Sequence, residues 1–322
     1  MTARRDPVQE ATDASVDLYD IATWEERTSL DGLAVALYRL LVGGTRLAVV
    51  LLALLILGTL GGLSALTNPQ VGALTGLSAI PALGLAAYVW YSDVTTPEPL
   101  SLLVVTFLLG MLTANFAAVV NSVLGDQFRA AGPIGMVVFF YLVVGPVEET
   151  VKLLAVRLWA FESASFDAVV DGAVYGAMAG LGFATIENAL YITRNLGGAA
   201  GNSLVGLIGA GAGITAIRAL AGPGHVIYSA FAGYYLGLAK FNSDDAGPIA
   251  VKGLLIAAFI HGTYNTLVTY LPFGIGTVAS ELQFFGFILV FDGVIVYALY
   301  RKLRRYRSHY RRATGDQRDG ET

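Results

Sequence analysis

Long apolar runs, each about the length of a membrane-spanning helix, follow one another along most of this chain. The pattern predicts an all-α protein, a polytopic transmembrane helical bundle with about eight spans (range seven to nine). The predicted spans, in chain order, cover residues 47–66, 71–91, 100–124, 133–160, 168–193, 225–241, 250–271 and 276–300.

A ninth apolar segment, residues 198–221, is rich in glycine and ends in Ala221-Gly222-Pro223-Gly224. Irregular backbone at membrane depth is tolerated where it is packed inside protein. We therefore expect a re-entrant or broken helix here, followed by a separate span at 225–241. Small residues also recur inside the 168–193 span, where they permit close helix packing in lipid.

The two ends of the chain are polar and differ in charge. Residues 1–32 form an acidic tail, residues 33–300 the predicted transmembrane domain, and residues 301–322 a basic tail. Basic segments tend to remain in the cytoplasm, so the C-terminus is predicted to be cytoplasmic. Arg39 and Arg46 before the first span predict the same side for the N-terminus, which requires an even number of spans.

Composition supports a multi-pass protein of the cell membrane. The chain has 322 residues, 55% hydrophobic and 14% charged, against about 25% charged in a soluble domain. Its mean hydropathy is +0.64. The absence of cysteine excludes disulfides, thiolate metal sites and cysteine nucleophiles. Of the three histidines, only His225 and His261 lie in apolar segments, because His309 belongs to the basic tail.

The stretch from Gly145 to Lys152 is the most unusual in the sequence. It places Glu148, Glu149 and Lys152 inside a long apolar run, at roughly 2.5–3.5 kcal/mol per charge on insertion scales. Adjacent helical residues point about 100° apart, so one glutamate should face a site and the other should lie beside it. Lys152 is spaced to pair with either glutamate.

Further polar residues lie within other apolar segments: Asp171, Glu187, Asn188, Arg218, His225, His261 and Asn265. His261 and Asn265 share a helix face and could together stabilise an oxyanion. Arg218 could pair with Asp171 or with Glu187. Each residue has a structural explanation by itself, such as an interhelical hydrogen bond for Asn188 or a helix-start position for Asp171. As a set they exceed what helix packing requires.

This set suits a carboxylate that activates water for attack on a carbonyl. A zinc site is the alternative, with His225, His261 and Glu149 or Glu187 as ligands. Its ligands would have to converge from several helices, because no His-Glu-x-x-His motif is present. The cofactor is thus either none or a divalent metal such as zinc. Buried carboxylates and histidines also form proton relays, so a proton-coupled transporter is the alternative function. A non-catalytic membrane scaffold is the third.

Four blocks resemble the PrsW family of intramembrane proteases. They are Glu-Glu-x-x-Lys at 148–152, Phe-x-x-x-Glu-Asn at 183–188, the His225 segment and His-x-x-x-Asn at 261–265. The loop from Asp93 through Pro97-Glu98-Pro99 is similar to another marker of the family. The resemblance covers about residues 90–270. It also implies a relationship to the CAAX-prenyl-protease-like (CPBP) membrane proteins, in which a histidine stands where this chain has Glu187.

The resemblance implies roles for named residues. Glu148 is the favoured base, with Glu149 close behind, and His261 and Asn265 form the oxyanion hole. The implied catalytic residues are Glu148, Glu149, Glu187, His225, His261 and Asn265. The implied supporting residues are Lys152, Asp171, Phe183, Asn188 and Arg218. Family members cleave membrane-anchored regulators such as anti-sigma factors, which implies a single-span or membrane-anchored protein substrate in the lipid bilayer and no nucleic-acid partner.

Overall fold

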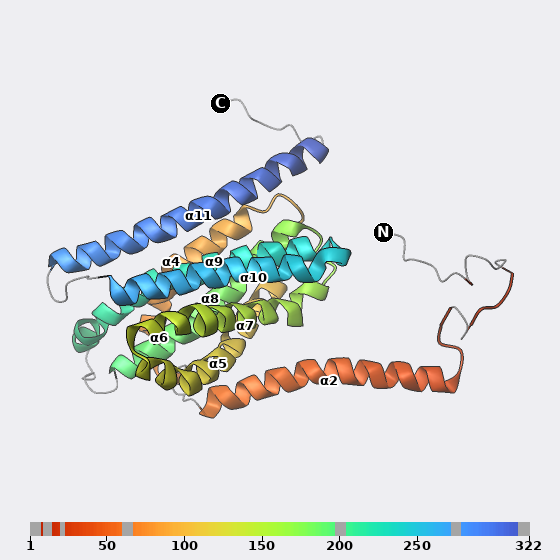
Figure 1. Cartoon of the computed structure of the whole chain (residues 1–322), viewed down its shortest axis with the longest axis horizontal. Coiled ribbons are helices and arrows are strands. Elements are labelled where there is room, and N and C mark those ends of the chain that lie inside the picture. Colours follow the sequence, from red (N-terminus) through yellow and green to blue (C-terminus); the bar gives the residue numbers. More distant parts are fainter. Residues whose placement is uncertain are drawn as a thin grey trace. The chain divides into compact units, whose positions relative to one another are not determined.

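The computed structural model describes residues 8, 15–19, 23–59, 67–196, 204–271 and 278–314, and these residues form helices without any β-strand (Figure 1). The chain divides into two units, residues 1–51 and 52–322. The helices are α2 (Ser29–Thr59), α4 (Pro69–Tyr91), α5 (Leu100–Ala130), α6 (Gly132–Phe139), η1 (Phe140–Val144), α7 (Gly145–Leu158), η2 (Ala160–Glu162), α8 (Val169–Leu196), α9 (Leu204–Lys240), η3 (Ser243–Asp245), α10 (Ala246–Tyr270) and α11 (Val278–Thr314).

Seven helical segments in the described ranges are long and apolar enough to cross a membrane. They comprise α2, α4, α5, the α6–α7 run, α8, α10 and α11. Helix α9 has 37 residues, so at 1.5 Å per residue it reaches about 55 Å and is also long enough to span a bilayer. The predicted polytopic helical bundle is therefore confirmed.

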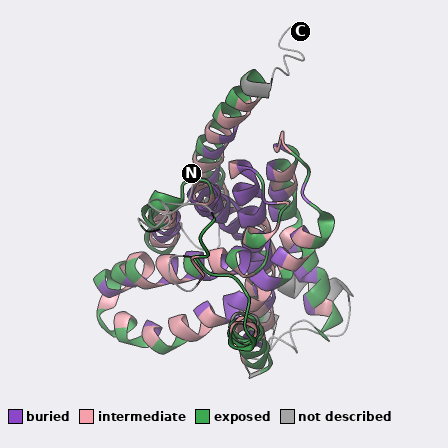
Figure 2. Ribbon diagram, turned by 90° about the vertical axis from the view of Figure 1, so that its right-hand side faces the viewer, coloured by how far each residue is buried: buried purple, intermediate pink, exposed green. Residues whose placement is uncertain are grey.

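Helix α8 is the central helix of the second unit. In its most apolar stretch 83% of the residues are buried, against 11% in α11. In Figure 2 purple, buried ribbon gathers in the middle of the bundle, whereas the helix that leads to the C-terminus is mostly green and pink. The exposed side chains of α11 are largely apolar, as in Leu289, Val290 and Val294, which is what a lipid-facing helix requires.

Helices α8 and α9 approach each other through glycines. A Cβ atom at Gly172, Gly176 or Gly180 would overlap the backbone oxygen of Gly233, Ser229 or His225, respectively. These three glycines are four residues apart and share one face of α8. The expectation that small residues bring helices together is confirmed, and the contact at Gly180 fixes the backbone of His225.

Two predicted elements prove to be one. The described part of the glycine-rich segment and the span at 225–241 together form α9, which continues through Pro223. The prediction of a re-entrant or broken helix was wrong for residues 204–221. Proline is tolerated inside transmembrane helices because packed neighbours satisfy the freed backbone groups.

The predicted span at 133–160 contains a wide turn. Residues 140–144 form a π-helical segment (η1) between α6 and α7, directly before Pro146. Proline lacks an N–H and clashes with the carbonyl four residues earlier, and an extra residue in the turn relieves both effects. The turn places Glu148 and Glu149 in the first part of α7.

Other predicted boundaries shift at the chain ends. The first span, predicted at 47–66, belongs to α2, which already begins at Ser29, and residues 60–66 lie outside the described residues. The last span does not stop at residue 300, because α11 continues through the basic segment to Thr314.

The long helical runs of the second unit alternate in direction along the chain, with α6, η1 and α7 forming one run (Figure 1). The loops at 92–99, 159–168 and 241–245 therefore lie at one end of the bundle, together with the C-terminal half of α11. Lys240 Nζ donates to the carbonyl of Phe161 (2.6 Å), and Lys302 Nζ donates to Tyr235 Oη (3.2 Å). We call this end, which includes the arginines of residues 301–312, the basic end. The opposite end holds the C-termini of α5, α8 and α10.

Candidate active site

A cavity of about 660 Å³ lies among α5, α7, α8, α9 and α10. Its lining includes Glu148, Glu187, His225, His261 and Asn265, all of which the sequence predicts as catalytic. Phe183 and Arg218 line it as well. Asp126, Arg129, Arg194 and Thr269 also line it and lie near the helix ends opposite the basic end, so the cavity opens there.

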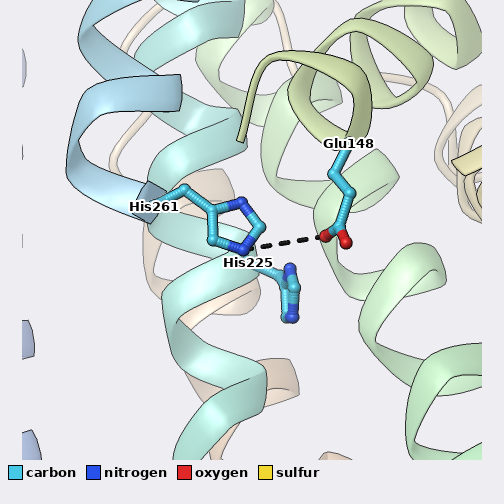
Figure 3. A group of neighbouring side chains, drawn as sticks. All are labelled: Glu148, His225 and His261. Atoms are coloured by element: carbon cyan, nitrogen blue, oxygen red, sulfur yellow. Dashed lines mark ion pairs between the residues drawn. The ribbon is translucent and has the colours of Figure 1, made fainter. Parts of the chain in front are cut away.

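Glu148, His225 and His261 converge from α7, α9 and α10 (Figure 3). Each is buried, and one ligand atom from each lies within 4.8 Å of the others. Glu148 Oε1 accepts a hydrogen bond from Asn121 Nδ2 (3.0 Å). Glu148 Oε2 is buried and has no hydrogen-bond partner among the described residues, and it lies 3.7 Å from His261 Nε2.

Glu149 lies beside the cavity and does not line it. Its Oε1 accepts from Lys152 Nζ (2.6 Å) and from His261 Nδ1 (2.9 Å), and its Oε2 accepts from Ser229 Oγ (3.4 Å). Glu149 and Lys152 are 0% and 1% exposed. Lys152 thus selects Glu149, and the expectation that one glutamate faces the site while the other supports it fits the observed geometry.

The contact with Glu149 sets the proton position on His261. A carboxylate paired with an ammonium accepts hydrogen bonds, so His261 Nδ1 must donate. Neutral His261 then has a lone pair at Nε2, facing Glu148. In that form Nε2 has no hydrogen to donate to an oxyanion, so the predicted oxyanion role would require the imidazolium form of His261. The lone pair at Nε2 can instead bind a metal ion or accept a hydrogen bond.

His225 is held from both sides. Lys152 Nζ lies 3.0 Å from Nδ1, and an ammonium can only donate, so Nδ1 accepts. The Nε2 atom therefore has the proton and donates it to Glu187 Oε2 (2.9 Å). The ring of Phe183 packs against His225 with centroids 5.1 Å apart, and Lys152 Nζ lies 4.3 Å from the Phe183 ring centroid. Phe183 thereby supports both groups.

Arg218 pairs with Glu187, and not with Asp171. Its Nη2 donates to Glu187 Oε2, and its Nε donates to Asn188 Oδ1 (2.7 Å). Asn188 Nδ2 in turn donates to Ser78 Oγ on α4 (2.9 Å). Asn188 therefore makes the expected interhelical hydrogen bonds and also orients the arginine.

These pairs leave one glutamate uncompensated. Glu149 with Lys152 and Glu187 with Arg218 each combine opposite charges. Glu148 forms no ion pair with a lysine or arginine in the part of the chain that the structure describes. Of the three glutamates at this site, Glu148 is the one whose charge no lysine or arginine of the described residues neutralises.

Two residues contribute that the sequence analysis did not single out, and one predicted residue lies elsewhere. Asn121 orients Glu148, and Ser229 contacts Glu149. Their signal in the sequence is the same as for the others, a polar side chain inside an apolar run. Asp171, predicted as a supporting residue, lies at the basic end in the first turn of α8, away from the cavity.

Comparison with known proteins fits this arrangement. A family model described as PrsW family intramembrane metalloprotease matches residues 98–297, which include all four sequence blocks. The chain belongs to the PrsW family. As a member of that family with a helical transmembrane fold, it is a membrane-embedded peptidase. The matched region excludes both polar tails.

Three curated relatives are each named Protease PrsW. The chain is 31% identical to the one from Bacillus subtilis (strain 168), over 59% of this chain and 80% of that protein. It is 30% identical to the one from Geobacillus kaustophilus (strain HTA426), over 58% and 76%, and 26% identical to the one from Shouchella clausii (strain KSM-K16), over 59% and 80%. These PrsW relatives give no support to the transporter alternative. No solved structure matches the chain significantly.

Proposed function

We propose that this PrsW protein is an intramembrane endopeptidase that hydrolyses a peptide bond of a membrane-anchored protein, with Glu148 as the residue that activates water. The observation that supports this most directly is Glu148 Oε2, a buried carboxylate oxygen without a hydrogen-bond partner at the cavity. A carboxylate so placed can accept a proton from water.

The residues of the cavity fit each step of such a hydrolysis. Water transfers a proton to Glu148 as its oxygen attacks the peptide carbonyl carbon, while Asn121 keeps the carboxylate oriented. The side-chain amide of Asn265, one helical turn from His261, donates a hydrogen bond to the developing oxyanion. The C–N bond then breaks as Glu148 returns the proton to the leaving nitrogen.

The same cluster fits a divalent metal ion. Glu148 Oε2 and the lone pair of His261 Nε2 are available as ligands, and His225 would complete the set through Nε2 after transferring the proton on that nitrogen to Glu187. In this arrangement Glu148 would be the carboxylate ligand, whereas the sequence analysis considered Glu149 or Glu187. Glu149 would then orient the metal ligand His261 by accepting the hydrogen bond from its Nδ1. Such an ion, when bound, polarises the attacking water and the peptide carbonyl.

If the cluster binds a metal ion, purified protein should contain a divalent metal in roughly stoichiometric amount. His261→Ala should lose the metal, because it removes the histidine nitrogen of this site that has an available lone pair. His309→Ala, on the exposed basic segment, is the matched control and should retain it. Elemental analysis by mass spectrometry measures both. Active protein without metal would assign Glu148 the role of a metal-free base.

The position of the cavity suggests the side from which substrate enters. The cavity opens at the end opposite the basic end, and basic segments tend to remain in the cytoplasm. With the C-terminus cytoplasmic, as proposed, the scissile bond reaches Glu148 from the outer face of the membrane.

The decisive experiment compares new protein termini in membranes from cells with the wild type and with a Glu148→Gln/Glu149→Gln double variant. Termini that appear only with the wild type would demonstrate proteolysis and identify the substrate. Matching sets of termini, with both proteins accumulated equally, would overturn the proposed function.

A further inference from the structure

Three carboxylates converge at the basic end, away from the active-site cavity. Asp93 and Glu98 come from the loop between α4 and α5, and Asp171 comes from the first turn of α8. One oxygen from each lies within 4.8 Å of the others. Acidic clusters are common, so the question is whether ordinary structural roles account for all three side chains.

In Asp93 and in Asp171, one carboxylate oxygen has an ordinary structural role. Asp93 Oδ1 accepts from the backbone N–H of Thr95 (2.8 Å) and from its Oγ1 (2.7 Å), as in an Asx turn. Asp171 Oδ2 accepts from the backbone N–H groups of Asp167 and Ala168, both at 2.7 Å. Among the described residues Asp93 Oδ2 has no hydrogen-bond partner, and Asp171 Oδ1 has only Thr95 Oγ1 at 3.4 Å.

Glu98 has no such role. Its residue is 3% exposed, and neither carboxylate oxygen has a hydrogen-bond partner among the described residues. It stands before Pro99, the cap residue of α5, which has no side-chain cap hydrogen bond. Burying a carboxylate without partners is costly. One of these unpartnered oxygens lies within 4.8 Å of an oxygen of Asp93 and of an oxygen of Asp171. Three converging carboxylates need positive charge beside them if they are to remain ionised.

The neighbouring lysine does not supply that charge directly. Lys240 Nζ donates to the carbonyl oxygens of Phe161 (2.6 Å) and Ser163 (3.3 Å). Within the described ranges no lysine or arginine forms an ion pair with Asp93, Glu98 or Asp171. A positive charge for the cluster must come from solution.

We propose that Asp93, Glu98 and Asp171 bind a hard divalent cation, Ca²⁺ or Mg²⁺. Carboxylate oxygens are the ligands that these ions prefer, and the cluster contains no nitrogen ligand. Half-buried Asp93 gives the ion a route from solvent. The hydroxyl of Tyr175, four residues after Asp171 on the same face of α8, is buried without a hydrogen-bond partner in the described ranges and adds an oxygen nearby. The bound ion fastens the loop at 92–99 to the start of α8.

Thermal unfolding of the full-length protein in detergent, stripped with chelator and titrated with CaCl₂ or MgCl₂, tests this site. The midpoint should rise saturably with at least one ion. Calorimetric titration should show the affinity falling at least about tenfold in Glu98→Gln and in Asp93→Asn. Asp244→Asn, an exposed carboxylate at the same end, is the control and should bind as the wild type does.

Two results would overturn the proposal. One is a midpoint that neither ion shifts. A Glu98→Gln variant more stable than the wild type at neutral pH would then indicate that the cluster holds a proton and not a metal. The other is an ion effect that survives in both Glu98→Gln and Asp93→Asn, which would place the ion elsewhere. Both readouts are independent of proteolysis, so the test does not depend on the proposed function.

Discussion

Replacing Glu148 by glutamine is expected to lower peptide-bond hydrolysis by about 10²–10⁴-fold, the usual contribution of a general base. The protein should accumulate normally, because glutamine has the same shape and Glu148 has no lysine or arginine partner to strand in the described structure. The amide cannot accept the proton of the attacking water, and it is a poor metal ligand. The loss is therefore expected whether or not a metal is present.

The measurement is the cleavage rate of the substrate that the terminus comparison identifies, in membranes with equal amounts of each protein. Glu162→Gln is a suitable control, since Glu162 pairs with Arg157 on the surface (3.0 Å) and exposed pairs contribute about 0–1 kcal/mol. Wild-type cleavage by Glu148→Gln would remove Glu148 from the chemistry and leave the proposed role to Glu149 or Glu187.

Replacing Lys152 by alanine is expected to destabilise the fold by about 3–5 kcal/mol, the cost of breaking a buried ion pair from one side. The substitution leaves Glu149 charged and 0% exposed, and it also removes the donor that fixes His225. Both the yield of folded protein and its activity should fall. Thermal unfolding and quantitation of folded protein in membranes measure the first effect, and substrate cleavage measures the second.

The matched control is the double variant Glu149→Gln/Lys152→Met, which removes both charges and keeps the volume. We expect it to recover much of the stability, because replacing a buried pair by neutral groups is often close to neutral. Activity should stay low, since His261 and His225 lose their fixed proton positions. Normal yield with lost activity in Lys152→Ala would contradict the structural role and place Lys152 among the reacting groups.

The sequence was informative about the helices because lipid requires long, uniformly apolar segments. It failed at α9, where glycine and proline break helices in water but not between packed helices in a membrane. Residue 223 therefore looked like a boundary and is an interior position. At the first span the sequence marked the apolar run and not the start of the helix, since α2 already begins at Ser29.

The sequence predicts which residues belong to the site, but it does not predict which of them pair with one another. A buried charge is visible in a sequence, but its partner depends on which long side chain reaches it. Spacing allowed Lys152 two partners and Arg218 two partners, and only the fold selects Glu149 and Glu187. Asp171 shows the opposite case, because its polar neighbours Asp93 and Glu98 come from a distant loop that no helical spacing could relate to it.

The wide turn at residues 140–144 has a consequence for how this region is aligned with its relatives. A π turn contains one residue more than an α turn, which corresponds to about 100° of rotation about the helix axis. Residues before 140 and after 144 therefore do not share one helical phase, although the apolar run is continuous. The position of a one-residue gap in this run therefore matters when the chain is aligned with a relative. A misplaced gap would match Glu148 with a residue of the relative that points away from the cavity.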